Sequence, residues 1–446
     1  MTVGISDGEL ILFFPKDKYE TLDISEYDWP PRIIFHFTAQ DETDVPADLE
    51  ETYYLDFSAL LDRITLSKLL DKWQVTLYMH RSLRKNIDEG DTHARLRVEY
   101  LGTWLDLMQQ GEGWRLWEVN RFLTDGAQHA FIAQINPLNP ATEVRISTAS
   151  QFGNQSNTVE EYVRFNRAVG GVNGGYFFSK FSLGMVVVKG EIASLPMLSR
   201  PVLAFADDGT PYIGYIHVVC NASIGERNPI YIETIDDFPH SGPVLLTPGH
   251  PSRVRGDFEG LKVIIMNDVI QYVTDTQVDD LVGKTIIWDP NGSTHVLRGV
   301  VPGESVDFEF SISGIPFQPL WAIQAGPMLV DNGTICDFSR GSFQANIIRG
   351  RSPRTAVALT VHGELLMFVG EGRMLHHSLG FSLEEVAELL IEIGAHTAMN
   401  LDGGASSSLY VNGRYWGLTP SYARKSIPNA IIFGEFSRWE SNTGSF

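Results

Sequence analysis

The feature that most constrains the fold is the alternation of short apolar runs with turn residues after residue 125. Examples are Val186–Val188 before Lys189-Gly190, and Lys262–Met266 before Asn267-Asp268. Turns favour glycine, asparagine and aspartate, and apolar runs this short suit strands better than helices. The pattern therefore predicts a region that is rich in sheet and low in helix. It shows no repeat of fixed period.

One helix is predicted near the C-terminus. Ser382 is a good N-cap, Glu385 completes a capping box with it, and Gly394 ends the apolar face that follows. The next run, Ala395–Leu401, is apolar enough for a buried strand. It leads directly into Asp402, so we expect this carboxylate at the C-terminal end of a strand, where ligand-facing groups are common in mixed sheets.

The N-terminal part differs in texture. Arg32–Phe37 is an apolar run after two prolines and predicts a strand, whereas Phe57–Leu70 has the apolar spacing of a helix. The acidic stretch Asp41–Glu51 is expected to be a solvated loop or the start of a helix. We therefore predict an α+β fold with a mixed, largely antiparallel sheet and covering helices. Residues 1–125 would form a smaller α/β-type domain of unknown role, and residues 126–446 the larger domain.

The charge of the chain limits its partners. It has 55 acidic and 34 basic residues, a formal charge of −21 at pH 7. Long nucleic acids and anionic membranes need a basic face, so both are poor candidates. No apolar run approaches the roughly 20 residues of a membrane-spanning helix. Met1–Pro15 does not read as a signal peptide, which favours the cytoplasm but leaves export or virion association open.

Two segments concentrate residues that could hold a ligand. Gly170–Phe178 places paired glycines on both sides of Asn173, and glycine lets a ligand approach the backbone closely. Read alone, this segment is better explained as a bulge or a hairpin in a sheet. Arg351–Thr355 places Arg354 at the start of an apolar strand, where a guanidinium could bind a phosphate or carboxylate. The alternative for that arginine is a structural ion pair.

The third segment is Asn400–Leu409. Its carboxylate, Asp402, is followed by two glycines and a run of serines, so the turn offers N–H and hydroxyl groups to sugar hydroxyls or phosphate oxygens. A solvated turn is the simpler alternative. Asn412-Gly413 predicts a two-residue hairpin turn just beyond it.

These segments, in this order, resemble the phosphodiester glycosidases. Arg200-Pro201 fits a further element of that family, and the likeness extends over Ala141–Phe433. Ala405 stands where members have a glycine, and Glu371-Gly372-Arg373 stands where they have Asp-Gly-Arg. The matching residues are Val172–Phe177, Ala325–Val330 with Asn332-Gly333, Arg351–Ala358 and Asn400–Ser407.

The resemblance implies cleavage of the glycosidic C1–O bond of a sugar 1-phosphodiester, carried by a small molecule or a glycan. We assign Asp402 as nucleophile or general base, Arg354 as the group that binds the phosphate, and Asn173 as a third catalytic-site residue. The remaining candidates would bind the substrate: Gly174, Gly175, Tyr176, Gly326, Arg351, Thr355, Glu371, Asn400, Gly403, Gly404, Ser406 and Ser407.

No cofactor is required by this chemistry, although Asp402 and neighbouring carbonyls could bind Ca²⁺ or Mg²⁺. His376, His377 and His396 show no metal-ligand spacing and are expected to be solvent or core residues. Two other functions stay open. One is a metal-dependent phosphodiesterase that cleaves the P–O bond of a small sugar or nucleotide phosphodiester. The other is a non-catalytic sugar-phosphate binding module in an envelope or virion assembly.

Overall fold

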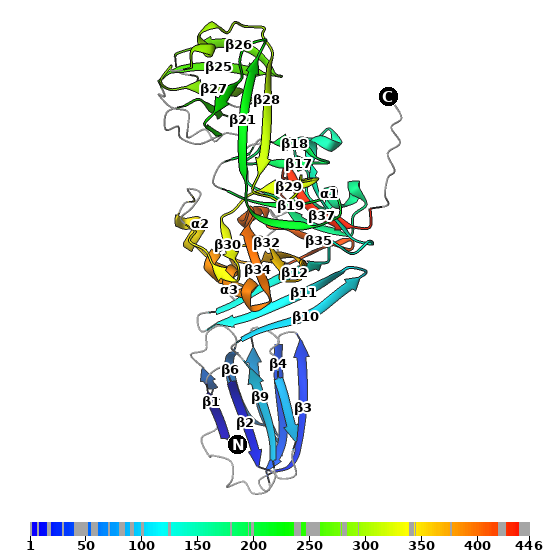
Figure 1. The fold of residues 1–446 in the computed structure, drawn as a ribbon. Coiled ribbons are helices and arrows are strands. Elements are labelled where there is room, and N and C mark those ends of the chain that lie inside the picture. The colour runs from blue at the N-terminus through cyan, green and yellow to red at the C-terminus, as the bar shows by residue number, and fades with distance from the viewer. Residues whose placement is uncertain are drawn as a thin grey trace. The chain divides into compact units, whose positions relative to one another are not determined.

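The computed structural model divides the chain into two compact units. Unit 1 comprises Met1–Leu107, Trp117–Ala130 and Gly370–Gly380, and unit 2 comprises Met108–Leu116, Phe131–Val369 and Phe381–Phe446. Figure 1 draws the strands and helices. The described residues are 2–6, 9–15, 19–28, 31–39, 52–54, 61–69, 72–79, 85–89, 93–99, 102–123, 126–178, 181–194, 196–197, 200–235, 242–246, 259–276, 278, 283–292, 294–338, 343, 345–374, 377–417 and 425–436.

The protein is mostly β, and the predicted α+β fold with covering helices is wrong. Within the described ranges the α-helices are α1 (Val159–Asn166), α2 (Ala345–Arg349) and α3 (Leu383–Glu392), all short. The regular elements in the described part of residues 1–125 are all strands, so the α/β-type N-terminal domain is wrong as well. Most of the regular hydrogen bonds join strands of the sheets, and the three short helices supply few of them.

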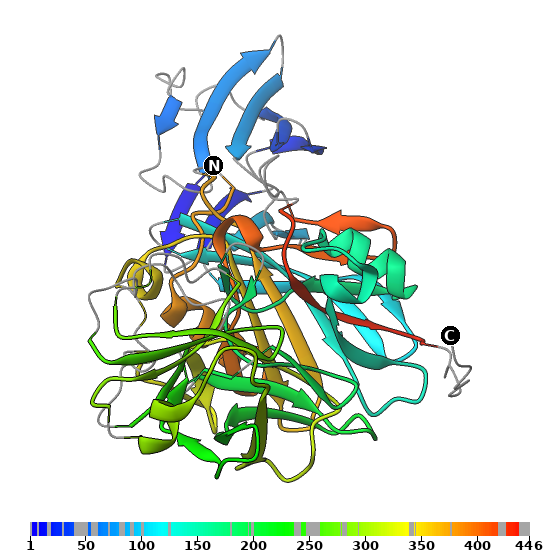
Figure 2. The ribbon, with the colours of Figure 1, turned by 90° about the horizontal axis from the view of Figure 1, so that it is seen from above.

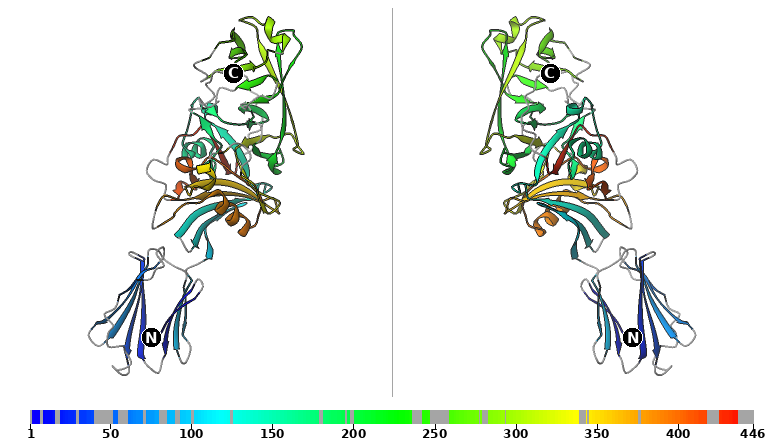
Figure 3. Two further views of the ribbon diagram at one scale, coloured as in Figure 1. Left: turned by 90° about the vertical axis from the view of Figure 1, so that its left-hand side faces the viewer. Right: turned by 90° about the vertical axis from the view of Figure 1, so that its right-hand side faces the viewer.

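Unit 1 contains two antiparallel sheets, which Figure 3 shows as two facing layers of blue strands. Ile33, Phe35 and Leu77 form part of the core beneath them. The strand predicted at Arg32–Phe37 is confirmed as β4. The sheet orders are β1 (Thr2–Ser6), β2 (Glu9–Pro15), β9 (His93–Glu99), β8 (Lys85–Glu89), and β3 (Tyr19–Asp28), β4 (Pro31–Ala39), β7 (Lys72–Met79), β6 (Leu61–Leu69), β5 (Thr52–Tyr54).

The helix predicted within Phe57–Leu70 is wrong, because Leu61–Leu69 is strand β6. Its pairing with β7 shifts register between Leu61 and Arg63. Such a bulge breaks the two-residue alternation of a strand, and the apolar spacing then resembles that of a helix. The acidic stretch Asp41–Glu51 lies outside the described residues.

Unit 2 is built around three sheets that share one apolar core, to which Val172, Ile323, Met399 and Phe433 belong. Four strands contribute residues to both units, namely β10 (Gly102–Gly111), β11 (Trp114–Leu123), β12 (Gly126–Ile135) and β33 (Leu365–Gly370). The sheet orders are β10 (Gly102–Gly111), β11 (Trp114–Leu123), β12 (Gly126–Ile135), β33 (Leu365–Gly370), β32 (Arg354–Thr360), β34 (Ala395–Asn400), β30 (Met328–Asp331), β31 (Thr334–Ile335); β13 (Glu143–Thr148), β37 (Asn429–Gly434), β14 (Gly170–Asn173), β35 (Leu409–Val411), β36 (Arg414–Trp416); and β18 (Glu191–Ser194), β17 (Val186–Val188), β29 (Trp321–Gln324), β19 (Pro201–Phe205), β20 (Pro211–Tyr215).

A second core of unit 2 is formed by the part of the chain between β20 and β29. Cys220, Ile265 and Ile287 belong to it, so the strands of this part pack on the antiparallel pair formed by β21 (His217–Ile224) and β28 (Val306–Ser313). The sheet orders are β22 (Ile230–Ile232), β21 (His217–Ile224), β28 (Val306–Ser313), and β23 (Thr234–Ile235), β24 (Val244–Leu246), β27 (Thr285–Asp289), β25 (Leu261–Met266), β26 (Val269–Thr274), with β15 (Phe177–Phe178) and β16 (Phe181–Ser182) as a separate pair.

Helix α3 begins where its capping residue predicts. Ser382 accepts a hydrogen bond from the Glu385 N–H (3.2 Å), and its own N–H donates to the Glu385 carboxylate (2.8 Å), so the predicted capping box of α3 is confirmed. The strand predicted after it is β34. Helix α1 packs beside β14, β35 and β37 (Figure 2). No helix in the described ranges combines the length and apolarity needed to cross a membrane.

Tyr162 of α1 provides a test of this packing. The side chain is fully buried and its hydroxyl donates to the Ile427 carbonyl oxygen (2.8 Å). Tyr162→Phe should lower the free energy of unfolding by about 1–3 kcal/mol, because the carbonyl loses its partner in a dry environment. Thermal unfolding of the intact protein measures this, with Tyr272→Phe at an exposed position as the control. Equal melting temperatures for the two variants would contradict the assigned role.

Candidate active site

The sheet register brings the sequence motifs to one edge. Ala356 of β32 lies opposite Asn400 of β34 in an antiparallel pair, so the start of β32 and the end of β34 coincide. Asn400 is the last residue of its strand, and Asp402 follows it, as predicted. The main-chain N–H of Asp402 donates to the carbonyl oxygen of Gly174 (3.2 Å), just beyond β14. The three segments singled out in the sequence therefore meet in space.

Asn173 connects these segments. It is fully buried, and its side-chain amide donates to the Asp402 carbonyl oxygen (2.7 Å). Its side-chain oxygen accepts from the Thr355 hydroxyl (2.7 Å) and from the Ser408 N–H (3.1 Å). The side chain thus joins the end of β14 to β32 and to both ends of the Asp402 turn. In this arrangement Asn173 and Thr355 hold the turn in place.

The paired glycines after Asn173 are explained by close approach. A Cβ atom on Gly174 would lie 2.0 Å from Oδ1 of Asn429, and one on Gly175 would lie 2.7 Å from the Gln324 carbonyl oxygen. The N–H of Gly175 donates to the same Asn429 oxygen (2.9 Å). Neither glycine needs a positive φ angle, so the constraint here is steric.

The turn after Asp402 rests on the loop before Arg354. Gly404 has a φ of 63° and its N–H donates to the Pro353 carbonyl oxygen (2.8 Å). A Cβ atom on Gly403 would lie 3.2 Å from that oxygen. Ala405 lies within the 3₁₀ turn Gly404–Ser406 and does not have a positive φ angle. The alanine at this position is therefore compatible with the turn.

The partly buried Tyr176 and the buried Asn400 form a polar pair. The Tyr176 hydroxyl donates to the Gly326 carbonyl oxygen (2.7 Å) and accepts from the Asn400 amide (2.8 Å). The Arg200 guanidinium lies over the Tyr176 ring, 5.3 Å from its centroid. Burial and the nearby charge of Asp402 raise the pKa of Tyr176 above its usual value, against the opposing charge of Arg200. The phenol is therefore neutral at pH 7.

Asp402 is a partly buried carboxylate. Its Oδ1 accepts from the Gly403 N–H (3.0 Å). Burial raises the pKa of Asp402, while a hydrogen bond from Ser406 and the positive charge of Lys425 oppose that rise. The carboxylate thus sits where its charged form is poorly solvated, which is typical of functional acids and bases.

The two arginines of the second motif differ. The Arg354 side chain is buried and donates from Nε to the Phe381 carbonyl oxygen (2.9 Å) and from Nη2 to those of Ile347 (2.6 Å) and Gly350 (2.5 Å). These bonds fix the plane of the guanidinium, and its charge also lowers the pKa of Tyr176. Arg351 instead donates from Nε to the Glu385 carboxylate (2.9 Å) of α3. Its visible role is an ion pair.

Two buried polar atoms near these residues lack a hydrogen-bond partner within the described parts of the chain. They are Oδ1 of Asn400 and Oγ of Ser407, on side chains at most 1% exposed. Leaving such an atom unpaired costs about 1–3 kcal/mol. Both lie in the Asn400–Ser407 motif, so the motif keeps unused hydrogen-bonding capacity.

Glu371 belongs to another group, in unit 1. The residue is 3% exposed, and its carboxylate contacts His129 and His377. Burial opposes ionisation, yet hydrogen bonds from both imidazoles lower the pKa of Glu371 to about 2. The structure thus pairs this predicted substrate-binding residue with two histidines, and no motif in the sequence connects them to it.

Three residues of the site were not among the predicted ones. Arg200 covers Tyr176, and the buried Gln324 side chain donates to the Arg200 carbonyl oxygen (3.0 Å). Asn429 fixes Gly175. Arg200 could have been found, because Arg200-Pro201 already fitted a family element. Gln324 and Asn429 are single polar residues in apolar strands, and that isolation is their only signal in the sequence.

Comparisons with known proteins agree with the motifs. The family model described as "Phosphodiester glycosidase" matches residues 259–434, less than half of the chain. The human N-acetylglucosamine-1-phosphodiester alpha-N-acetylglucosaminidase is 34% identical over 100 residues, which span 21% of this chain and 18% of the human protein. The predicted resemblance to phosphodiester glycosidases is thus confirmed, and it is partial and distant.

Solved structures show likeness of fold alone. A protein from Synechocystis matches with a TM-score of 0.60 at 18% identity, covering 97% of this chain and 79% of that one. A protein from Burkholderia pseudomallei matches with a TM-score of 0.51 at 14% identity, covering 94% and 97%. Both matches extend over nearly the whole chain, so the β-rich architecture is shared well beyond residues 259–434.

The glycine at position 174 provides a test of the site's geometry. Gly174→Ala should lower the thermal stability and displace the Asp402 turn, because the added methyl group would overlap Asn429. Gly299→Ala is the matched control, since a Cβ atom there meets nothing within 4 Å. Differential scanning calorimetry of both variants measures the effect. A Gly174 variant as stable as the Gly299 variant would contradict the close approach.

Proposed function

We propose that this chain hydrolyses the glycosidic C1–O bond of a sugar 1-phosphodiester and releases a free sugar and a phosphomonoester. The family-level resemblance supports a phosphodiester glycosidase. The observation that carries the proposal is the Asp402 cluster, which we define as Asn173, Tyr176, Arg200, Arg354, Asn400 and Asp402. It combines one poorly solvated carboxylate with two cations whose charges reach Tyr176.

The chemistry suits a single carboxylate. In ordinary glycoside hydrolysis a second carboxyl group protonates the leaving oxygen. A phosphomonoester is weakly basic, so its oxygen can leave without that proton. The C1–O bond would break with its electron pair on the phosphate oxygen. Water would supply the new oxygen at C1, and its proton would pass to solvent, by way of the Asp402 carboxylate where Asp402 is the base. Asp402 would act as nucleophile or as the base for that water.

The arginines would serve the phosphate. Arg354 is held by three backbone carbonyl groups, so its charge needs no reorganisation during the reaction. Arg200 lies beside Tyr176 and adds a second positive charge. A phosphodiester placed near both would have the growing charge of its leaving oxygen stabilised. The backbone of the Gly403–Ser407 turn would hold sugar hydroxyls or phosphate oxygens.

Asp402→Asn tests the role of the carboxylate. We expect kcat to fall by at least about 10²-fold, because the amide cannot act as nucleophile or base, while the folded structure persists. Release of phosphomonoester from an N-acetylglucosamine 1-phosphodiester is the first assay, since the human relative is named for that linkage. Asp307→Asn, at an exposed position of β28, should keep full activity. A rate near that of the wild type in the Asp402 variant would contradict the role of Asp402 as nucleophile or base.

Heavy-oxygen water separates the bonds that could break. In water enriched in oxygen-18, cleavage of C1–O leaves the phosphomonoester unlabelled, and cleavage of P–O places the label on phosphate. Mass spectrometry of the phosphomonoester reads the result directly, and free sugar incubated alone controls for exchange at C1. Labelled phosphate would establish a phosphodiesterase instead. Absence of turnover across a broad panel of sugar 1-phosphodiesters would argue for a binding role.

The pH dependence of the activity is a second test of the Asp402 carboxylate. Because Asp402 must be ionised to act, and burial raises its pKa, kcat/KM should fall with decreasing pH through a value above the roughly 3.9 of a free aspartate. Lys425→Met should move this acid limb to still higher pH, because the lysine charge opposes the rise. If kcat/KM of Lys425→Met falls at the same pH as that of the wild type, the titrating group is not Asp402.

A further inference from the structure

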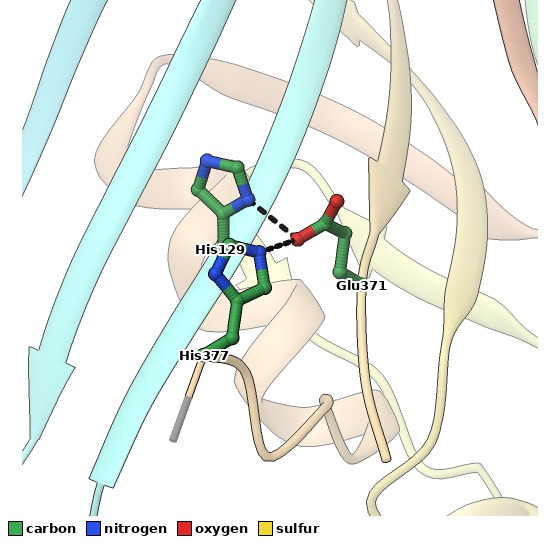
Figure 4. A group of neighbouring side chains, drawn as sticks. All are labelled: His129, Glu371 and His377. Atoms are coloured by element: carbon green, nitrogen blue, oxygen red, sulfur yellow. Dashed lines mark hydrogen bonds and ion pairs between the residues drawn. The ribbon is translucent and has the colours of Figure 1, made fainter. Parts of the chain in front are cut away.

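Unit 1 holds a second cluster of chemically active side chains, which the proposed reaction does not use. His129 lies on β12, and Glu371 and His377 follow β33 (Figure 4). Nδ1 of His129 is 2.6 Å from Oε2 of Glu371, and Nε2 of His377 contacts the same oxygen. One nitrogen of each imidazole thus converges on one carboxylate.

The cluster is built into the fold. His129 and Glu371 are each 3% exposed. The Glu371 N–H donates to the His129 carbonyl oxygen (2.8 Å). The Ser378 hydroxyl donates to the Glu371 carbonyl oxygen (2.9 Å) and accepts from the His129 N–H (3.1 Å). These bonds fix the backbone positions from which His129 and Glu371 project.

The ligand atoms have the spacing and chemistry of a zinc site. Nδ1 of His129, Nε2 of His377 and a carboxylate oxygen of Glu371 lie within 4.8 Å of one another. Zn²⁺ binds imidazole nitrogen and carboxylate oxygen at about 2.0–2.2 Å, so one ion between these atoms could reach all of them after small side-chain shifts. Two histidines and one glutamate are also a common set of three protein ligands for zinc.

A fourth residue has the position of a supporting ligand partner. Oε1 of Glu118, on β11, lies 2.5 Å from Nε2 of His129, the nitrogen that faces away from Glu371. Metal-binding histidines usually donate their other N–H to a carboxylate, which orients the ring and makes it a better ligand. The side chain of His377 is 26% exposed, so the cluster is open to solvent at this residue.

We propose that His129, Glu371 and His377 bind one Zn²⁺ ion, with Glu118 as the carboxylate that orients His129. A water molecule completes the tetrahedral coordination from the exposed side. The argument rests on four side chains from three segments of the chain, each placed by the contacts given above. It does not depend on the reaction proposed for the Asp402 cluster.

Zinc uptake by the intact protein tests the proposal. The full chain is stripped with a chelator and dialysed against ZnCl₂, and bound metal is counted by inductively coupled plasma mass spectrometry. We expect one zinc per chain in the wild type and none in His377→Ala. His362→Ala, at an exposed position of unit 2, should retain the full stoichiometry. No stoichiometric zinc in the wild type, or equal uptake by the His377 and wild-type proteins, would overturn the site.

Two further measurements guard against a variant that fails to fold. Glu118→Gln keeps the three ligands, so it should still bind one zinc but about 10–100-fold more weakly by isothermal titration calorimetry. Zinc should also raise the melting temperature of the wild type and leave that of His377→Ala unchanged. Unchanged affinity in the Glu118 variant would remove Glu118 from the site. A shift common to both proteins would overturn the assignment of His377.

Discussion

The buried side chain of Asn173 is the interaction on which the candidate active site depends. It must donate to the Asp402 carbonyl oxygen and accept from Thr355 and Ser408 at once. Only an amide offers both a donor and an acceptor of this shape without a charge to bury. In aspartate, an oxygen would replace the amide nitrogen that donates to the Asp402 carbonyl oxygen, so two acceptors would face each other. Leucine would leave the buried polar partners of Asn173 unpaired. The Asp402 turn therefore keeps its position only while residue 173 is an amide.

Sequence reasoning succeeded where the signal is local. The capping box at Ser382, the strand after it and the position of Asp402 at its end all follow from neighbouring residues. It failed at Leu61–Leu69, where a register shift gave strand residues a helix-like spacing. Whether a strand contains a bulge is set by its partner strand, and the sequence of one segment does not hold that information. The expected covering helices are also wrong, because apolar residues of several sheets pack against one another in one core.

The candidate site divides in the same way. The motif residues near Asp402 could be predicted because the family resemblance groups them, whereas the two arginines of one motif separate only in space, Arg351 to Glu385 and Arg354 to backbone carbonyls. His129 and Glu371 are 242 residues apart, and ligand spacing rules read only short intervals. Long-range pairs of this kind come from the sheet register alone.

The two clusters suit ligands of opposite charge. In the Asp402 cluster the carboxylate is poorly solvated, and the charges of Arg200 and Arg354 lie close enough to Tyr176 to lower its pKa. Such a group favours an anionic substrate beside a reactive carboxylate. Glu371, by contrast, faces two imidazole nitrogens, and these atoms form the proposed zinc site. A phosphodiester would meet the carboxylates of Glu118 and Glu371, and a zinc ion would be repelled by the arginines. The electrostatics of each cluster therefore restrict it to one of the two ligands.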